Sequence, residues 1–227
     1  AVVGVAKNLN IPVCEMKIKK DDPSGLFNLF DIESEYQLPE ENDEGLVLHT
    51  SGTTSRPKIV PLTNKNIYSS AENISKSLNL SEADHCLNIM PLFHIHGLIA
   101  ILAASIRSGA SICASNGFNA LKFLELAKSE KITWYSGVPT MHQAILLRAE
   151  KNLELAKNLN LRLIRSSSAS LPPAVFEKLN SVFGCSVIEA YGMTEATHQM
   201  TSNPLPPKKQ KPGFVGIPAG PEVCIMD

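Results

Sequence analysis

Short apolar runs recur along the chain and have the length of β-strands. Many of their side chains are β-branched, and the runs do not alternate strictly with polar residues, which is typical of strands covered on both faces. We predict strands at residues 1–6, 11–16, 45–50, 85–90, 110–114, 132–136, 161–166 and 186–190. The final residues, 222–227, have the same strand-like pattern.

Segments with helical spacing lie between most of these runs. After Thr63, a candidate N-cap, the apolar residues Ile67, Ala71, Ile74 and Leu78 fall on one helical stripe. The same spacing predicts helices within residues 97–108, 119–130, 140–152 and 172–183. This alternation predicts an α/β fold with a mostly parallel sheet flanked by helices.

Two stretches interrupt the alternation and suggest how the chain is divided. Residues 19–44 are acidic and rich in turn formers, so we expect a surface connection there. We therefore expect residues 1–18 to be a strand remnant of a preceding subdomain, 45–202 the α/β subdomain, and 203–227 the start of a following β segment. Because the chain opens at Ala1 and ends in a strand-like run, we expect a piece of a longer protein.

Composition narrows the function classes. The 227 residues carry a formal charge of −1, which argues against a nucleic-acid binder held by bulk electrostatics. The longest apolar run, 97–106, is too short to cross a bilayer, so no membrane span is predicted. Five cysteines are widely spaced and include no CxxC pair, which favours buried thiols in a reducing compartment, the cytoplasm or, in a eukaryote, the peroxisome.

The run HTSGTTSRPKIVPLT, residues 49–63, concentrates candidate chemistry. Small hydroxyl residues, one glycine, Arg56 and Lys58 together favour a cradle for polyphosphate, because they offer backbone amides, hydroxyl donors and cations. The run is not a Walker motif, since Lys58 follows a proline and no serine or threonine follows it. The alternative for a loop of this composition is a plain surface turn.

Four such segments each follow a predicted strand. They are residues 49–58, PLFHIHG at 91–97, SSSASLP at 166–172 and YGMTEATH at 191–198. Ligands of open parallel sheets bind beyond the carboxyl ends of the strands. We therefore expect the four segments to meet at one edge of the sheet.

Residues 191–198 offer three groups suited to a nucleotide. Tyr191 could stack on a base, Thr194 could donate to a phosphate, and Glu195 could hold a magnesium ion that bridges phosphates. The alternative is a turn in which Glu195 caps a following helix.

Two histidines and two aromatic residues have competing interpretations. If the backbone is extended there, His94 and His96 face the same side, as metal ligands would. No third ligand has suitable spacing, so hydrogen bonding to substrate or a core position fits better than zinc. Trp134 and Tyr135 lie on a predicted strand and are expected in the core.

The motifs HTSGTTSRPK, PLFHIHG, SSSASLP and EAYGMTE resemble, in this order, four signature loops of the adenylate-forming acyl-CoA synthetases. GFVGIPAG, residues 213–220, resembles another landmark of that family. Within the family, TSGTTSRPK, WYSGVPTMHQ, RSSSASLP and EAYGMTEATHQMTSNPLP are most similar to the oxalate–CoA ligase group. The resemblance covers most of the chain and implies part of a large N-terminal α/β domain.

The resemblance implies a two-step ligase that uses ATP, Mg²⁺ and coenzyme A on a small carboxylic acid. The residues it assigns to the β- and γ-phosphates are Thr50, Ser51, Gly52, Thr53, Thr54 and Lys58. Adenine would be bordered by Ser168, Ala169 and Ser170 on one side and by Glu189, Ala190 and Tyr191 on the other. Thr194 would contact the α-phosphate and Glu195 would hold Mg²⁺, so that Thr194, Glu195 and Lys58 are the candidate catalytic residues.

The second carboxylate of oxalate would need hydrogen-bond donors in place of an apolar channel. His94, Ser168 and His198 supply imidazole and hydroxyl groups from three loops that are expected at the same edge. We predict that these three residues bind the distal carboxylate.

The chain departs from the family pattern in two respects. Ser55 and Ile59 replace glycines of the phosphate loop, and a β-branched Ile59 would be strained if its φ were positive. The family's ribose-binding aspartate, its hinge and its C-terminal lid with a catalytic lysine lie outside the matched motifs. The 227 residues alone are therefore expected to be inactive.

Three other functions stay open at this point. The first is a fatty-acyl, aryl or luciferase-like adenylating enzyme of the same superfamily, and the second is a non-catalytic nucleotide-binding module. The third, a dinucleotide-binding protein, is disfavoured because no GxGxxG follows an early strand. The sequence gives no indication of the oligomeric state.

Overall fold

The computed structural model describes residues 2–13, 16–17, 28–29, 37–50 and 57–226. The chain divides into two compact units, residues 1–39 and 40–227. In the first unit, helix α1 (Val2–Asn8) precedes two short strands, β1 (Met16–Lys17) and β2 (Asn28–Leu29), which pair antiparallel. The strand predicted at residues 1–6 is therefore wrong. A helix satisfies its own backbone groups, whereas a strand needs a partner, and no described strand pairs with this run.

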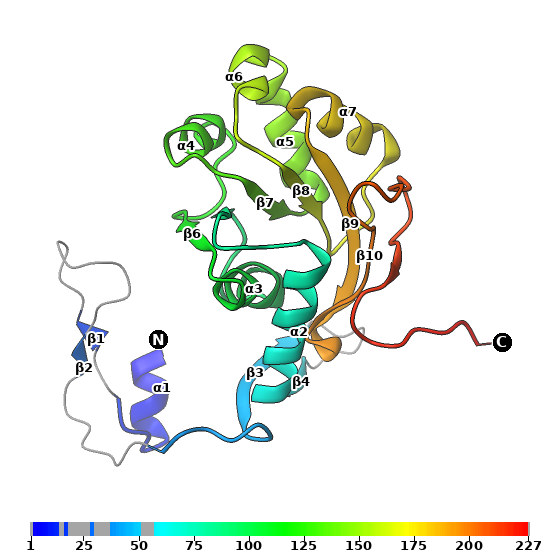
Figure 1. Cartoon of the computed structure of the whole chain (residues 1–227). Helices are drawn as coiled ribbons and strands as arrows, with labels where there is room; N and C mark the ends of the chain where they lie inside the picture. Colours follow the sequence, from blue (N-terminus) through cyan, green and yellow to red (C-terminus); the bar gives the residue numbers. More distant parts are fainter. Residues whose placement is uncertain (1, 14–15, 18–27, 30–36, 51–56, 227) are drawn as a thin grey trace. The chain divides into compact units, whose positions relative to one another are not determined.

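The second unit contains a seven-stranded sheet with the order β11-β10-β9-β8-β7-β5-β6 (Figure 1). Its strands are β5 (His85–Asn88), β6 (Ser111–Ala114), β7 (Trp134–Gly137), β8 (Leu163–Ser166), β9 (Ser186–Met193), β10 (His198–Ser202) and β11 (Ile217–Pro218). The five strands from β6 to β9 are parallel, while β10 and β11 add an antiparallel edge. The predicted α/β class with a mostly parallel sheet is confirmed.

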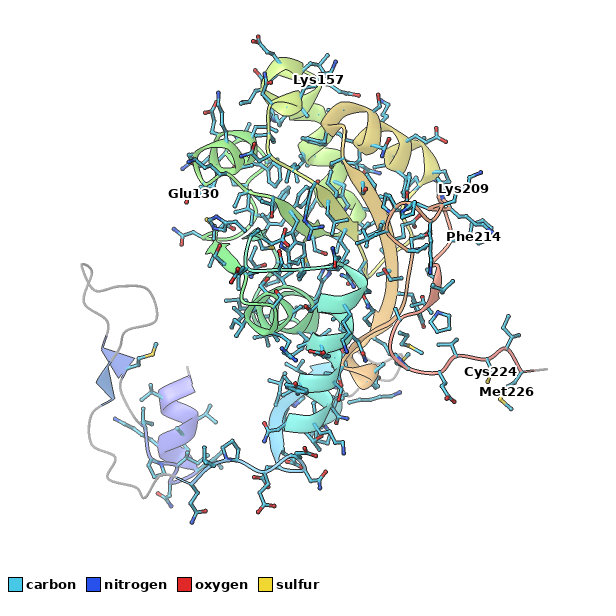
Figure 2. All side chains as sticks on the ribbon, viewed as in Figure 1. Glu130, Lys157, Lys209, Phe214, Cys224 and Met226 are labelled. Carbon is cyan, nitrogen blue, oxygen red and sulfur yellow. The ribbon has the colours of Figure 1, made fainter. Side chains whose placement is uncertain are left out.

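Helices cover both faces of this sheet (Figure 1). They are α2 (Asn64–Ser77), the π-helix η1 (His96–Ala103), α3 (Ala104–Arg107), α4 (Phe123–Ser129), α5 (Pro139–Ala149), α6 (Leu153–Lys157) and α7 (Pro173–Phe183). One core cluster joins α4, α5, α6 and α7 to the sheet, and the other joins α2, η1 and α3 to it. Figure 2 shows side chains filling the space between the sheet and these helices.

Neighbouring residues of the parallel strands belong to opposite clusters. Trp134 packs in the cluster with α2 and Tyr135 in the cluster with α5, and both are fully buried, as expected for core positions. The pairs Cys86 and Leu87, Leu163 and Ile164, and Val187 and Ile188 divide in the same way. Because successive side chains of a strand point to opposite faces, this division explains the continuous apolar runs of the sequence.

A separate hairpin precedes α2. Strands β3 (Glu44–Thr50) and β4 (Lys58–Thr63) pair antiparallel and form their own two-stranded sheet. The strand at residues 45–50 was predicted, but β4 was not. Thr63 caps α2 as expected, because its hydroxyl accepts from the Asn66 amide at 3.2 Å while the Asn66 side chain accepts from the Thr63 amide at 3.0 Å.

Several boundaries differ from those predicted. β9 continues through Tyr191–Met193 in place of a loop, and α6, β10 and β11 were not predicted. The strand expected at the end of the chain is wrong for residues 222–226, which form no regular structure. Cys224 and Met226 are labelled on this exposed segment in Figure 2. No described strand pairs with it, so the apolar pattern alone cannot hold a strand there.

Candidate functional site

Two adjoining cavities lie beyond the carboxyl ends of the central strands. Cavity A, of about 390 Å³, is lined by Thr50, Lys58, His94, Ile95, Ser168, Gly192, Met193, Thr194, Glu195 and His198. Cavity B, of about 260 Å³, is lined by Ser168, Ala169, Ser170, Glu189, Ala190, Tyr191, Gly192, Gly213 and Val215. The structure thus brings the described parts of all four predicted segments together, whereas Ser51, Gly52, Thr53 and Thr54 lie outside the described residues.

The hairpin brings Thr50 and Lys58 to cavity A. The two residues face each other as the last pair of the β3–β4 register, so the predicted phosphate loop starts and ends at the cavity. Thr50 Oγ1 is buried and has no hydrogen-bond partner among the described residues. Ile59 pairs with His49 in the register, and it is not among the described residues with a positive φ. Isoleucine therefore causes no backbone strain at this position.

Thr194 and Glu195 lie in the tight connection between β9 and β10. A single 3₁₀ turn, η2 (Thr194–Ala196), is followed by Thr197 at φ 52° and His198 at φ 90°. β10 begins at His198, so Glu195 caps no following helix and that alternative is wrong. Two consecutive non-glycine residues with positive φ are unusual, and such strain is typical of functional sites.

The two histidines of the PLFHIHG segment do not share a face. His94 lies in a bend and His96 begins η1, so the backbone is not extended as two metal ligands would require. His94 is exposed and lines cavity A, whereas His96 is fully buried beneath it. No cluster of three or more metal-ligating side chains occurs among the described residues. His96 is the hydrogen-bonded core histidine of the second interpretation.

A buried polar network lies under cavity A and centres on Arg165 of β8, which is fully buried. Its guanidinium donates to Ser136 Oγ at 3.3 Å and to Gln199 Oε1 at 3.1 Å. The same group lies 3.5 Å from His96 Nε2 and 3.4 Å from His198 Nδ1. Sequence analysis missed Arg165 and Ser136, although an arginine at the end of the apolar run LRLIRS was a usable signal.

Burial controls the charges of this network. Loss of solvent, followed by the neighbouring His198 and Arg165, holds the pKa of His96 well below its ordinary value. Burial and then Arg165 have the same effect on the pKa of His198. Burial lowers the pKa of Arg165 to about 9, so this group is still a cation at neutral pH. Two neutral imidazoles therefore contact one buried cation.

Cavity B has one wall on the loop after β8 and the other on β9. Ser167 Oγ donates to the Ala190 carbonyl at 2.9 Å, which joins the two walls. Ser168 has a φ of 70°, and this turn places it in both cavities. Glu189 accepts from the Gly213 amide at 2.7 Å, while burial raises its pKa. Tyr191 is 45% exposed and lines cavity B.

The donor set of cavity A fits a magnesium nucleotide. Mg²⁺ usually takes one or two carboxylates from a protein and completes its shell with waters and substrate phosphates. Glu195 offers an exposed carboxylate beside the hydroxyl of Thr194 and the orphaned hydroxyl of Thr50. Lys58 lines the same cavity and supplies a cation for the phosphates.

These features define an α/β protein with a polar cavity at the carboxyl edge of its sheet. Residues 6–227 match the family model described as AMP-binding enzyme, and the chain belongs to this family. No described helix is long and apolar enough to cross a membrane.

Known relatives agree with this family. The chain is 48% identical over 200 residues to the oxalate–CoA ligase of Arabidopsis thaliana, an alignment that covers 86% of this chain and 39% of that protein. It is 45% identical over 186 residues to the oxalate–CoA ligase of Saccharomyces cerevisiae, covering 82% and 34%. A malonyl-CoA ligase in a ternary product complex with methylmalonyl-CoA and AMP superimposes with a TM-score of 0.71 at 33% identity, covering 79% and 38%. The chain therefore spans less than two fifths of the length of these relatives.

Proposed function

We propose that the protein is an ATP-dependent acid–CoA ligase that forms an acyl-adenylate and then a thioester. The observation that carries this proposal is the convergence of Lys58, Thr194 and Glu195 on cavity A, next to cavity B. These residues come from the β3–β4 hairpin and the β9–β10 connection, which are far apart in the sequence. The named relatives, all CoA ligases, support the same activity.

In the first step, an oxygen of the acid attacks the α-phosphorus of ATP and pyrophosphate leaves. Lys58 and the hydroxyl of Thr50 meet the negative charge of the β- and γ-phosphates, and Thr194 donates to the α-phosphate. Glu195 would hold Mg²⁺, which neutralises phosphate charge when it is bound with ATP. The loop after β8 and residues Glu189–Tyr191 would hold adenine in cavity B.

In the second step, the thiol of coenzyme A attacks the acyl carbon, loses its proton, and displaces AMP. A reducing compartment, the cytoplasm or peroxisome, stays our proposal from the wide spacing of the five cysteines.

We propose oxalate as the acid. His94, Ser168 and His198 line cavity A together, and their imidazole and hydroxyl groups suit a second carboxylate. A fatty-acyl or aryl ligase would need an apolar channel in this place. Identities of 48% and 45% to two oxalate–CoA ligases support the same choice.

Replacing Glu195 with glutamine tests the adenylation site. In the complete protein, we expect Glu195→Gln to lower oxalate-dependent exchange of pyrophosphate into ATP by about 100-fold, because an amide is a poor ligand for Mg²⁺. The matched control is Glu125→Gln on the exposed surface of α4, which should leave exchange unchanged. Exchange with acetate or a fatty acid in preference to oxalate would refute the proposed acid, and equal exchange by both variants would refute the role of Glu195.

A further inference from the structure

The network under cavity A contains a cation that has no counter-ion among the described residues. Arg165 is fully buried, and no carboxylate within the described residues pairs with it. Its Nε is also buried without a hydrogen-bond partner in the described part of the chain. An uncompensated buried charge is costly for folding, so a protein that keeps one generally uses it. Arg165 lies directly below the residues that we propose to bind the acid, and this position indicates what its charge is used for.

The hydrogen bonds of Arg165 fix the tautomer of His96. Ser136 Oγ accepts from Arg165 and lies 2.6 Å from His96 Nε2, close to the guanidinium itself. Arginine can only donate, and a hydrogen on Nε2 would face the guanidinium. The Ser136 hydroxyl has no other acceptor among the described residues, so we assign it as the donor to Nε2. The proton of the neutral ring is then on Nδ1, which lies 3.1 Å from Ser168 Oγ. Ser168 accepts this bond, and within the described residues its own proton has no acceptor and can be donated into cavity A.

The same guanidinium fixes His198 in the opposite tautomer. Its other terminal nitrogen lies 3.4 Å from His198 Nδ1, so Nδ1 must accept and the proton must be on Nε2. Nε2 has no partner within the described residues, and His198 lines cavity A. Gln199 holds this end of the guanidinium in place, since its Oε1 accepts from Arg165 while its Nε2 donates to Ser77 Oγ at 2.9 Å.

We propose that Arg165 is the positioning residue for a dicarboxylate, acting through Ser136, His96 and His198. It turns the Ser168 hydroxyl and His198 Nε2–H into donors aimed at one carboxylate, and its charge attracts that carboxylate from below. This inference rests on the proposed function for the identity of the acid, but the tautomers are independent of it. A monocarboxylate gains nothing from the arrangement.

Histidine tautomers provide a direct test. In the complete protein labelled with ¹⁵N at histidine, long-range ¹H–¹⁵N spectra should show His96 protonated at Nδ1 and His198 protonated at Nε2. Peaks can be assigned with single His→Gln variants. Arg165→Met should mix the tautomers of both rings, a change that mere loss of packing elsewhere would not produce. An Nε2–H tautomer for His96 in the unsubstituted protein would overturn the proposal.

Steady-state kinetics test the consequence. Arg165→Met should raise KM for oxalate by about 100-fold and leave KM for ATP within about twofold, because a buried charge facing a carboxylate is removed. Arg165→Lys keeps the charge without the fork and should recover part of the loss. Ser136→Ala keeps the charge but breaks the link to His96, and we expect about a tenfold increase. Arg148→Met, at an exposed position on α5, is the matched control.

These outcomes separate failure of this inference from failure of the proposed function. If the protein prefers a monocarboxylate, the proposed acid is wrong, whereas the tautomers still decide the role of Arg165. If oxalate is the substrate and a folded Arg165→Met changes neither its KM nor the tautomers, this inference is wrong. If Arg165→Met does not fold, unchanged oxalate KM in both Arg165→Lys and Ser136→Ala overturns it.

Discussion

Substituting alanine for Gly192 should disrupt both the stability of the sheet edge and the candidate site. A Cβ at this position would overlap the backbone carbonyl of His198 and lie 3.1 Å from the Cα of Gln199. Gly192 faces Gln199 in the β9–β10 register, so β10 would have to move away. We expect the free energy of unfolding to fall by about 2–4 kcal/mol, measured by urea denaturation of the chain.

The same displacement of β10 should also move residues of the candidate site. The connection between Gly192 and His198 carries Thr194 and Glu195, and misplacing reacting groups by about 1 Å can cost 100-fold in rate. We therefore expect at least this loss in adenylation by the complete protein. Gly184→Ala is the control, because Gly184 has φ +64° but nothing within 4 Å of a new Cβ. It should cost only about 1 kcal/mol of left-handed strain. Equal destabilisation by the two variants would contradict the close approach at Gly192.

The parallel part of the fold was predictable because its strands are buried on both faces. Runs such as the one around Trp134 and Tyr135 must supply apolar side chains to two clusters, and this leaves a clear pattern. The candidate site was predictable for a related reason. Residues that the sheet does not need, such as Ser168 and Glu195, come directly after those runs and meet at its carboxyl edge.

The antiparallel strands could not be predicted because residues that line the cavities or form turns interrupt their hydrophobic patterns. The end of β9 contains Tyr191 and Gly192, which serve cavity B and the close approach of β10, so the segment has no strand-like alternation. Strand β4 includes Pro61, which is found only where a ladder hydrogen bond is dispensable, as in an edge strand. Arg165 was hidden because its partners are long-range: Ser136, His198 and Gln199 come from other strands.

Acid should unfold the chain at a pH well above the range in which ordinary carboxylates titrate. His96, His142 and His198 are fully or almost fully buried, and burial is the main cause that depresses the pKa of each, to about 4 for His142. Well above pH 6.5, neither the folded nor the unfolded chain protonates these rings, so they make stability independent of pH there. Below it, only the unfolded chain takes up protons, and stability falls until the folded pKa is passed.

The size of this effect follows from the number of rings. Each contributes up to about 1.4 kcal/mol per pH unit, so three give about 4 kcal/mol per unit. Between pH 6.5 and pH 5 the loss is about 6 kcal/mol, so a domain at the lower end of the usual stability range of about 5–15 kcal/mol would unfold near pH 5. Glu189 opposes this trend, because burial raises its pKa and the folded state takes up its proton first. The loss from Asp84 comes only below about pH 4: burial raises its pKa, but the hydrogen bonds from Arg162, Ser81 and Thr133 outweigh burial.

Denaturation curves at several pH values measure this dependence. His142→Gln removes one ring that lies outside the two cavities, so we expect the slope between pH 6 and pH 5 to fall by about 1.4 kcal/mol per unit. His49→Gln, at an exposed position on β3, is the matched control for the substitution. Because His96 and His198 accept hydrogen bonds from Arg165, protonating either ring would place two cations in contact in the core. A stability that stays constant from pH 7 to pH 5 would show that these rings are not held neutral, and the donor assignment at Ser168 and His198 would fail with it.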